Sequence, residues 1–83
     1  MTYASLNEHQ REIVDASRIL LVEYLHRTWE SIEDGNHDNA VYYLGKFDES
    51  LKDADYMNDY FPEITKERLK RFADRLEERA KMI

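Results

Sequence analysis

The chain has 83 residues, no cysteine, two glycines, one proline and a formal net charge of −6. These values fit one domain, exclude a disulfide framework or a thiolate metal site, and leave too few turn residues for a β-rich fold. The negative charge disfavours direct contact with nucleic acid or with an anionic membrane surface. We therefore expect a single helical domain over residues 1–83.

Two sequence features bear on the compartment in which the protein acts. The longest apolar run, residues 19–22, is far shorter than the ~20 residues that a membrane-spanning helix needs. The first residues carry neither a basic region nor an apolar stretch, so no signal peptide is predicted. We expect a cytoplasmic protein that has no membrane partner.

The first predicted helix spans residues 6–34. Val22 and Trp29 lie at one edge of its apolar face, seven residues apart. An apolar face this wide predicts contact with more than one neighbour, and we expect it to support a homodimer. The helix should end at Gly35, which accepts a left-handed backbone, and Asn36 should cap the next helix. The residues of the apolar face are Leu6, Ile13, Leu20, Leu21, Tyr24, Leu25, Thr28 and Ile32.

The second predicted helix spans residues 37–57. Gly45 lies in its middle, where glycine costs roughly 1 kcal/mol relative to alanine, and the missing side chain favours a close helix crossing. Pro62 disfavours helical backbone at Phe61, so the helix should end before this stretch. Its inward seam is spaced four, three, four and three residues apart: Ala40, Leu44, Phe47, Leu51 and Ala54.

The third predicted helix spans residues 65–82, with Thr65 as its N-cap. The spacing of its apolar seam, like that of the second helix, predicts helices that pack against other helices. Because the connections are short, we predict an all-α fold, a small antiparallel three-helix bundle made of a helical hairpin plus a third helix. The seam of the third helix is Leu69, Phe72, Leu76, Ala80 and Ile83.

Charge is unevenly spread along the chain. Residues 30–60 carry nine acidic residues against two lysines, a net charge of −7, whereas residues 61–83 have a net charge of +2. The acidic segment should repel nucleic acid and attract a basic protein surface. The third helix carries four arginines on one side, and we expect them to lie along the core and pair with acids of neighbouring helices rather than bind phosphates. These arginines are Arg68, Arg71, Arg75 and Arg79.

One spacing in the sequence is typical of a metal site. Glu23 and His26 form an E-x-x-H pair, which in some helix bundles supplies two ligands to a di-iron centre. Such a centre needs two copies of the motif, and the single copy here falls on the polar side of its helix. A metal-binding bundle is therefore only a further alternative, and we expect no catalytic, cofactor-binding or metal-binding residues.

Tyrosines and carboxylates share one face of the second predicted helix, opposite its apolar seam. Tyrosine is enriched at protein interfaces, so this face is the predicted partner-binding surface. The alternative left open is that the long first helix, or the loop at Phe61, folds over this face and buries it. The predicted partner-binding residues are Tyr42, Glu49, Asp53, Tyr56, Asp59 and Tyr60.

From these features we expect a non-enzymatic adaptor or inhibitor that binds a protein partner with a basic surface. The alternative is a DNA mimic, in which carboxylates replace phosphates and occupy a nucleic-acid-binding protein. In size and charge the chain is similar to phage-encoded inhibitors of host proteins, including anti-CRISPR and anti-restriction proteins. That likeness, which rests on no motif, implies an inhibitor of a nucleic-acid-binding host protein.

Overall fold

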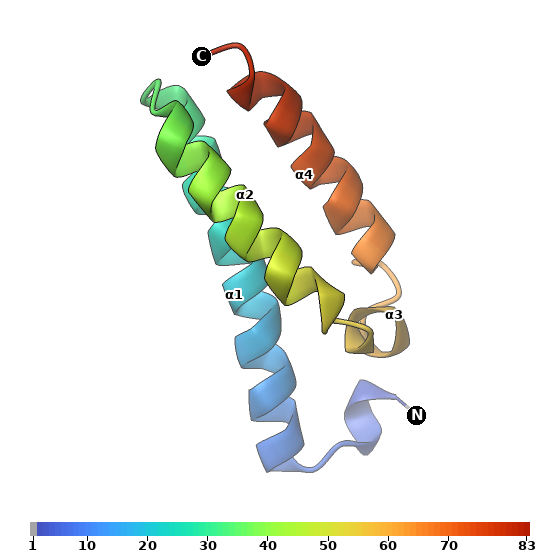
Figure 1. Ribbon diagram of the computed structural model, residues 1–83. Helices are drawn as coiled ribbons and strands as arrows, with labels where there is room; N and C mark the ends of the chain where they lie inside the picture. The colour runs from blue at the N-terminus through green and yellow to red at the C-terminus, as the bar shows by residue number, and fades with distance from the viewer. Residues whose placement is uncertain (1) are drawn as a thin grey trace.

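The computed structural model describes residues 2–83, and over that range it is helical with no strand. A short 3-10 helix, η1 (Tyr3–Ser5), is followed by α1 (Glu8–Glu33), α2 (His37–Lys52), α3 (Tyr56–Tyr60) and α4 (Lys66–Ala80). The three long helices α1, α2 and α4 pack together, and η1 and α3 lie at one end of them (Figure 1). The bundle is elongated, with extents of 44 × 20 × 17 Å. The predicted all-α bundle is confirmed.

The predicted signals at Gly35, Asn36 and Thr65 are confirmed, and Asn7 caps α1, which begins at Glu8 rather than at residue 6. Gly35 adopts a φ of +70°, and the Asn36 side chain then accepts the Asn39 backbone N–H at 3.1 Å to begin α2. Thr65 accepts the Arg68 backbone N–H at 3.3 Å and begins α4. At the start of α1, Asn7 accepts the backbone N–H of the residue three positions on at 2.8 Å. These polar side chains satisfy donors that a helix N-terminus leaves free, so the local sequence sets where α1, α2 and α4 begin.

The apolar seam of α2 forms the centre of the core, as predicted. Ala40 and Phe47 have no exposed surface, and the other three seam residues are each less than a tenth exposed. This seam packs between α1 and α4, which each contribute buried apolar side chains of their own. The core cluster consists of Leu21, Leu25, Leu44, Phe47, Leu51, Ala54, Met57, Leu69, Ala73 and Leu76.

The predicted seam of α4 is wrong at two positions. Phe72 is 47% exposed and Ile83 is 45% exposed, whereas Ala73 is buried. Helical spacing alone permits either residue 72 or residue 73 beside Leu69 and Leu76, since both lie within one broad arc. The structure turns the smaller Ala73 inward, toward the groove between α4 and α2, and Ile83 lies beyond the end of the helix.

The inward face of α1 is narrower than predicted. Ile13 is 54% exposed and Leu20 is 45% exposed, although both were expected to face the core. The buried residues of α1 are Leu21, Leu25 and Thr28, all within the predicted face, together with Ser31, which was not. Two of them, Thr28 and Ser31, are polar. Each of these hydroxyls donates to a backbone carbonyl four residues earlier at 2.8 Å, which satisfies the buried oxygen within the helix itself.

The second predicted helix divides into two. α2 ends at Lys52, and α3 begins only at Tyr56, so the expected helix over residues 37–57 is wrong beyond residue 52. A tight turn forms instead, in which the Ala54 N–H donates to the Leu51 carbonyl at 3.1 Å. On an uninterrupted helix the Met57 side chain would point roughly 100° away from the seam, because each residue advances ~100° around the helix axis. The turn brings Met57 into the core, where it has no exposed surface.

η1 and the segment after α3 close one end of the bundle. The Tyr3 hydroxyl donates to the Asp15 carboxylate of α1 at 2.7 Å, and the Tyr3 ring lies 5.5 Å from the ring of Phe61. The guanidinium of Arg18 lies 4.5 Å from the centre of the same Phe61 ring, within range of a cation–π interaction. Together these contacts link the start of the chain and the loop before α4 to the middle of α1.

The two phenylalanines provide a matched test of the core. We expect Phe47→Ala to destabilise the fold by roughly 3–5 kcal/mol, since it removes a fully buried ring. Phe72→Ala should cost about 1 kcal/mol or less when measured in dilute protein, because the ring is half exposed. Urea unfolding followed by circular dichroism gives both values. Equal losses for the two variants would contradict the assignment of the α4 face.

The two glycines are expected to respond in opposite directions to alanine. A Cβ atom built at Gly45 meets nothing within 4 Å, so the close helix crossing expected there does not occur. Gly45→Ala should therefore stabilise α2 by about 0.5–1 kcal/mol. Gly35→Ala should destabilise by about 1 kcal/mol, since its φ of +70° is left-handed. Chemical denaturation measures both, and a destabilising Gly45→Ala would mean that this position is closely packed.

The stability that the Tyr3–Asp15 hydrogen bond gives to the fold should depend on pH. The hydrogen bond to Asp15 raises the pKa of the Tyr3 hydroxyl above its ordinary value, so the folded state favours the protonated phenol. Its contribution is fully present below the pKa of the unfolded chain, near 10, and is lost as pH rises through the higher folded pKa. Tyr3→Phe should lower Tm at pH 8, and its gap to the wild type should shrink above pH 10. Tyr42→Phe, at an exposed ring, is the control, and a Tyr3→Phe gap independent of pH would contradict the hydrogen bond.

Candidate protein-binding surface

Three of the predicted partner-binding residues lie together on the outer side of α2. Tyr42, Glu49 and Asp53 are spaced seven and four residues apart, which places them on one stripe opposite the buried seam. All three are exposed, and Tyr42 has 57% of its surface open to solvent. We call Tyr42, Glu49 and Asp53 the α2 stripe. It combines the ring of Tyr42 and the carboxylate of Glu49, both on α2, with the carboxylate of Asp53 at the C-cap of the helix.

Neighbouring side chains hold the Tyr42 ring in place. The ring of Tyr43 packs edge-on against it, with centroids 5.2 Å apart and an angle of 76° between the planes. The Lys46 ammonium lies 5.7 Å from the Tyr42 ring centre, close enough for a weak cation–π attraction. A ring that is already positioned loses less conformational freedom on binding than a mobile one.

The other three predicted residues are separated from the α2 stripe by the turn after α2. Asp59 is exposed on α3, but Tyr56 and Tyr60 are only partly exposed. Tyr56 packs against the core, and burial of its hydroxyl raises its pKa. Tyr60 lies beside Arg18 of α1 in a shallow hollow. The alternative that the long first helix covers part of this face therefore holds for α3, since Tyr56 lies near Ser17 and Arg18 of α1, while the α2 stripe stays open.

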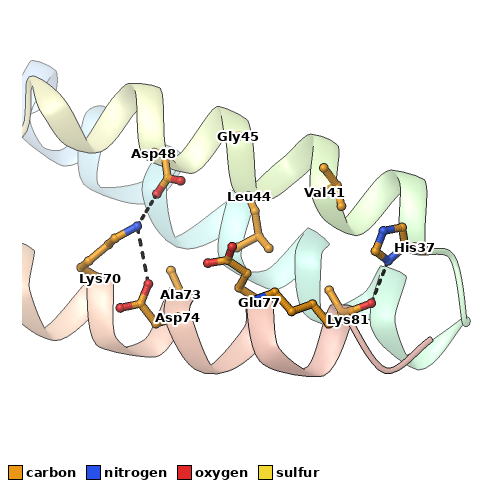
Figure 2. Close-up of a pocket in the computed structure, with 11 residues that line it drawn as sticks. His37, Val41, Leu44, Gly45, Asp48, Lys70, Ala73, Asp74, Glu77 and Lys81 are labelled. Carbon is orange, nitrogen blue, oxygen red and sulfur yellow. Dashed lines mark hydrogen bonds and ion pairs between the residues drawn. The ribbon is translucent and has the colours of Figure 1, made fainter.

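A groove between α2 and α4 is a feature that the sequence analysis did not anticipate. It has a volume of about 410 Å³, and it is lined by side chains from the two helices (Figure 2). Its one sequence signal is Gly45, which lines the groove and adds no side chain to fill it. Val41, Leu44 and Ala73 form its apolar floor and wall.

Three charged side chains of this groove, Asp48, Lys70 and Asp74, are paired with one another. Lys70 extends from α4 to Asp48 of α2 at 3.1 Å and also lies 3.5 Å from Asp74 (Figure 2). The hydrogen bond to Asp48 raises the pKa of Lys70, so the ammonium stays charged. At the far end, Nδ1 of His37 lies 2.7 Å from the carbonyl oxygen of Ala80 and, as the hydrogen-bond donor, carries the proton. These contacts join α2 to α4.

The arginines of α4 do not have the positions expected from the sequence. Arg68, Arg71, Arg75 and Arg79 are all exposed, and within residues 2–83 none of them forms a salt bridge. The expectation that they pair with acids of neighbouring helices is wrong because the lysines occupy the side of α4 that faces α2. Lys66 pairs with Asp55 at 2.8 Å, and Lys70 with Asp48.

The E-x-x-H pair takes part in contacts within α1. Glu23 accepts a hydrogen bond from Arg27 at 2.9 Å, and His26 lies 2.6 Å from Glu30. Within residues 2–83 there is no group of three or more His, Asp or Glu side chains placed to hold a metal ion. Nor does any described helix have the length and apolar character needed to cross a membrane.

Comparison with known proteins gives no relative: the sequence matches no family model, and searches of curated proteins and of solved structures return no match.

Proposed function

We propose that this is a non-enzymatic cytoplasmic protein that acts as an adaptor or inhibitor by binding a protein partner with a basic surface. The observation that carries the proposal is the α2 stripe, in which Tyr42 is 57% exposed yet held by Tyr43. Exposed, positioned tyrosines are the aromatic anchors typical of protein interfaces. Glu49 and Asp53 supply the negative charge that steers a basic partner toward the ring.

The remaining predicted residues have secondary roles in this proposal. Asp59 is exposed on α3, beyond the turn that follows α2, and adds to the negative charge of residues 30–60. Tyr56 and Tyr60 are partly buried, so they support the position of α3 rather than act as anchors. The proposed contact area is therefore centred on Tyr42 rather than on Tyr56.

We also propose that consecutive long helices run antiparallel to each other. Three contacts support it for α2 and α4: His37 with Ala80, Asp48 with Lys70, and Asp55 with Lys66. The residue numbers fall along α4 as they rise along α2 and the turn that follows it. We also propose that the bundle self-associates, through a side of the molecule other than the α2 stripe.

A DNA mimic remains the second candidate, because exposed carboxylates accompany Tyr42 along α2. Glu49 on α2 and Asp53 at its C-cap are both exposed, and residues 30–60 have a net charge of −7. In a phage-type inhibitor of this kind, charge would contribute most of the affinity, and the tyrosine would contribute little. The two candidates therefore predict different responses to the same substitutions.

Site-specific photo-crosslinking tests the proposed surface. We expect a photoreactive phenylalanine at position 42 to cross-link a protein in host lysate that the same residue at exposed position 9 does not. Unlabelled wild-type protein should compete for this cross-link. Tyr42→Ala should compete at least tenfold less well, since an aromatic anchor commonly contributes about 2 kcal/mol or more.

Charge reversal then separates the two candidates. With an aromatic anchor, Glu49→Lys or Asp53→Lys should mainly slow association and change its salt dependence. With a DNA mimic, these reversals should abolish competition, Tyr42→Ala should have a mild effect, and DNA should compete for the partner. Identical cross-linking from positions 42 and 9 would contradict both candidates for this surface.

A further inference from the structure

The outer side of α4 presents arginines around one exposed aromatic ring. Arg68, Phe72, Arg75 and Arg79 are spaced four, three and four residues apart and therefore form one stripe, with Arg71 next to it. Phe72 is 47% exposed. The opposite edge of α4 faces α2 through Lys70, so this stripe lies on the α1 side of the helix.

α1 presents a matching apolar strip on its α4 side. Arg18, Val22, Leu25 and Trp29 follow the same spacing of four, three and four residues. Arg18 lies over Phe61, in the segment that leads to α4, and Leu25 belongs to the core. The Arg18–Phe61 contact orients the strip toward the segment that leads into α4. Val22 and Trp29 on it are nonetheless 49% and 42% exposed.

The next stripe around α1, away from the core, is acidic. Ile19, Glu23, His26 and Glu30 each follow a residue of the apolar strip by one position, which is a turn of ~100° outward. Ile19 is 62% exposed, and the ring of His26 stacks near Trp29 with centroids 6.4 Å apart. α1 therefore borders the apolar strip with carboxylates.

These stripes make one continuous face, which we call the α1–α4 face. Its middle is apolar, formed by Val22, Trp29 and Phe72. One margin, on α1, carries Glu23 and Glu30, whose exposed carboxylates lie beside Arg27 and His26 of the same helix. The other margin, on α4, carries Arg71, Arg75 and Arg79, which have no salt-bridge partner within residues 2–83.

We propose that the α1–α4 face is the interface with a second copy of this chain, related by a twofold axis that runs parallel to the helices. Rotation about such an axis places α1 of each copy opposite α4 of the other. The acidic margin then meets the basic margin twice, as a twofold interface requires. The exposed apolar side chains of the two copies meet in the middle and are removed from water.

The positions along the helices agree with this pairing. Two contacts, His37–Ala80 and Asp48–Lys70, fix the position of α4 along the bundle axis relative to α2. The tight turn at Gly35 does the same for α2 relative to α1. We call the position of a residue along this axis its level. Because all α-helices rise 1.5 Å per residue, these contacts place Glu23 near the level of Arg71. They place Glu30 within a turn of Arg79. A rotation about an axis parallel to the helices keeps these levels, so opposite charges meet in the dimer.

The charge pattern favours a second copy over other occupants. A nucleic acid would gain from the arginines but would be repelled by the carboxylates along the other margin. An acidic protein would meet the same repulsion. A copy of this chain offers an acidic margin, an apolar middle and a basic margin at the required spacing. The interface lies on the side of the bundle away from the α2 stripe, so the dimer and the partner-binding proposal can fail separately.

The wild-type protein alone provides the first test. Trp29 is the single tryptophan of the chain, and it lies in the proposed interface, so its fluorescence reports assembly directly. We expect sedimentation equilibrium at low salt to show a monomer–dimer equilibrium between about 1 µM and 1 mM, the range for a modest interface. The Trp29 emission should shift to the blue over the same range. A monomer with unchanged emission at the highest concentration would overturn the proposal.

Charge exchange tests the geometry. An acid-reversed variant, Glu23→Arg with Glu30→Arg, should place like charges opposite each other in its own dimer. A base-reversed variant, Arg71→Glu with Arg75→Glu, should do the same. Each should weaken self-association by at least about tenfold, because every reversed contact occurs twice. An equimolar mixture of the two variants should form a heterodimer, since α1 of each then meets opposite charge on α4 of the other.

A control variant separates this effect from net charge. Glu49→Arg with Asp53→Arg changes the charge by the same amount as the acid-reversed variant but lies on the α2 stripe, and it should leave dimerisation unchanged. Far-UV circular dichroism should show that each variant is folded. Phe72→Asp, which replaces a half-exposed ring in the middle of the interface, is a further variant that should prevent dimerisation. Weakening by the control to the same degree, or a mixture that stays monomeric, would overturn the proposed pairing of α1 with α4.

Discussion

Burial of the α2 seam is the interaction on which the rest of this structure depends. Phe47 and Ala40 are completely buried, and the remaining seam residues nearly so, because α2 lies between α1 and α4. In so small a domain, burial of apolar surface is the main favourable term that opposes the loss of chain entropy. Once this seam is inside, α2 has only its outer side and its two edges left to present to solvent. One edge becomes the groove with α4, and the outer side carries Tyr42, Glu49 and Asp53.

The difference in helix length explains how the other surfaces arise. α1 has 26 residues and α2 has 16, so the first part of α1 extends past the end of α2. The chain covers part of this extension with η1 and α3, through Tyr3, Arg18 and Phe61. Apolar residues on the sides of α1 that these segments do not reach, such as Leu20 and Val22, stay about half exposed. The exposed surface of α1 is thus a direct result of how few residues are available to cover it.

The sequence predicted the features that depend on local chemistry. Gly35, Asn36 and Thr65 end or cap helices through their own backbone or side-chain geometry, and the α2 seam has a spacing that allows one inward face. The choice between Phe72 and Ala73 was not predictable in this way, because it depends on how closely α4 approaches its neighbours. The turn after Lys52 contains neither glycine nor proline, and it forms because tertiary packing draws Met57 into the core. The same turn divides the predicted binding face. Tyr56, next to Met57, becomes partly buried, whereas Tyr42 lies before the turn and stays exposed on the outer side of α2.

The three-helix cross-section gives the molecule two sides that do not interfere with each other. The α2 stripe points away from the seam, and the α1–α4 face lies across the core from it. Two copies joined through that face would carry their stripes on opposite outer surfaces, separated by the thickness of both bundles. Such a dimer would be bivalent, and its apparent affinity for a target with repeated sites would depend on the effective local concentration as well as on the intrinsic affinity of each stripe. A chain too small to build a large binding surface would then obtain avidity from symmetry.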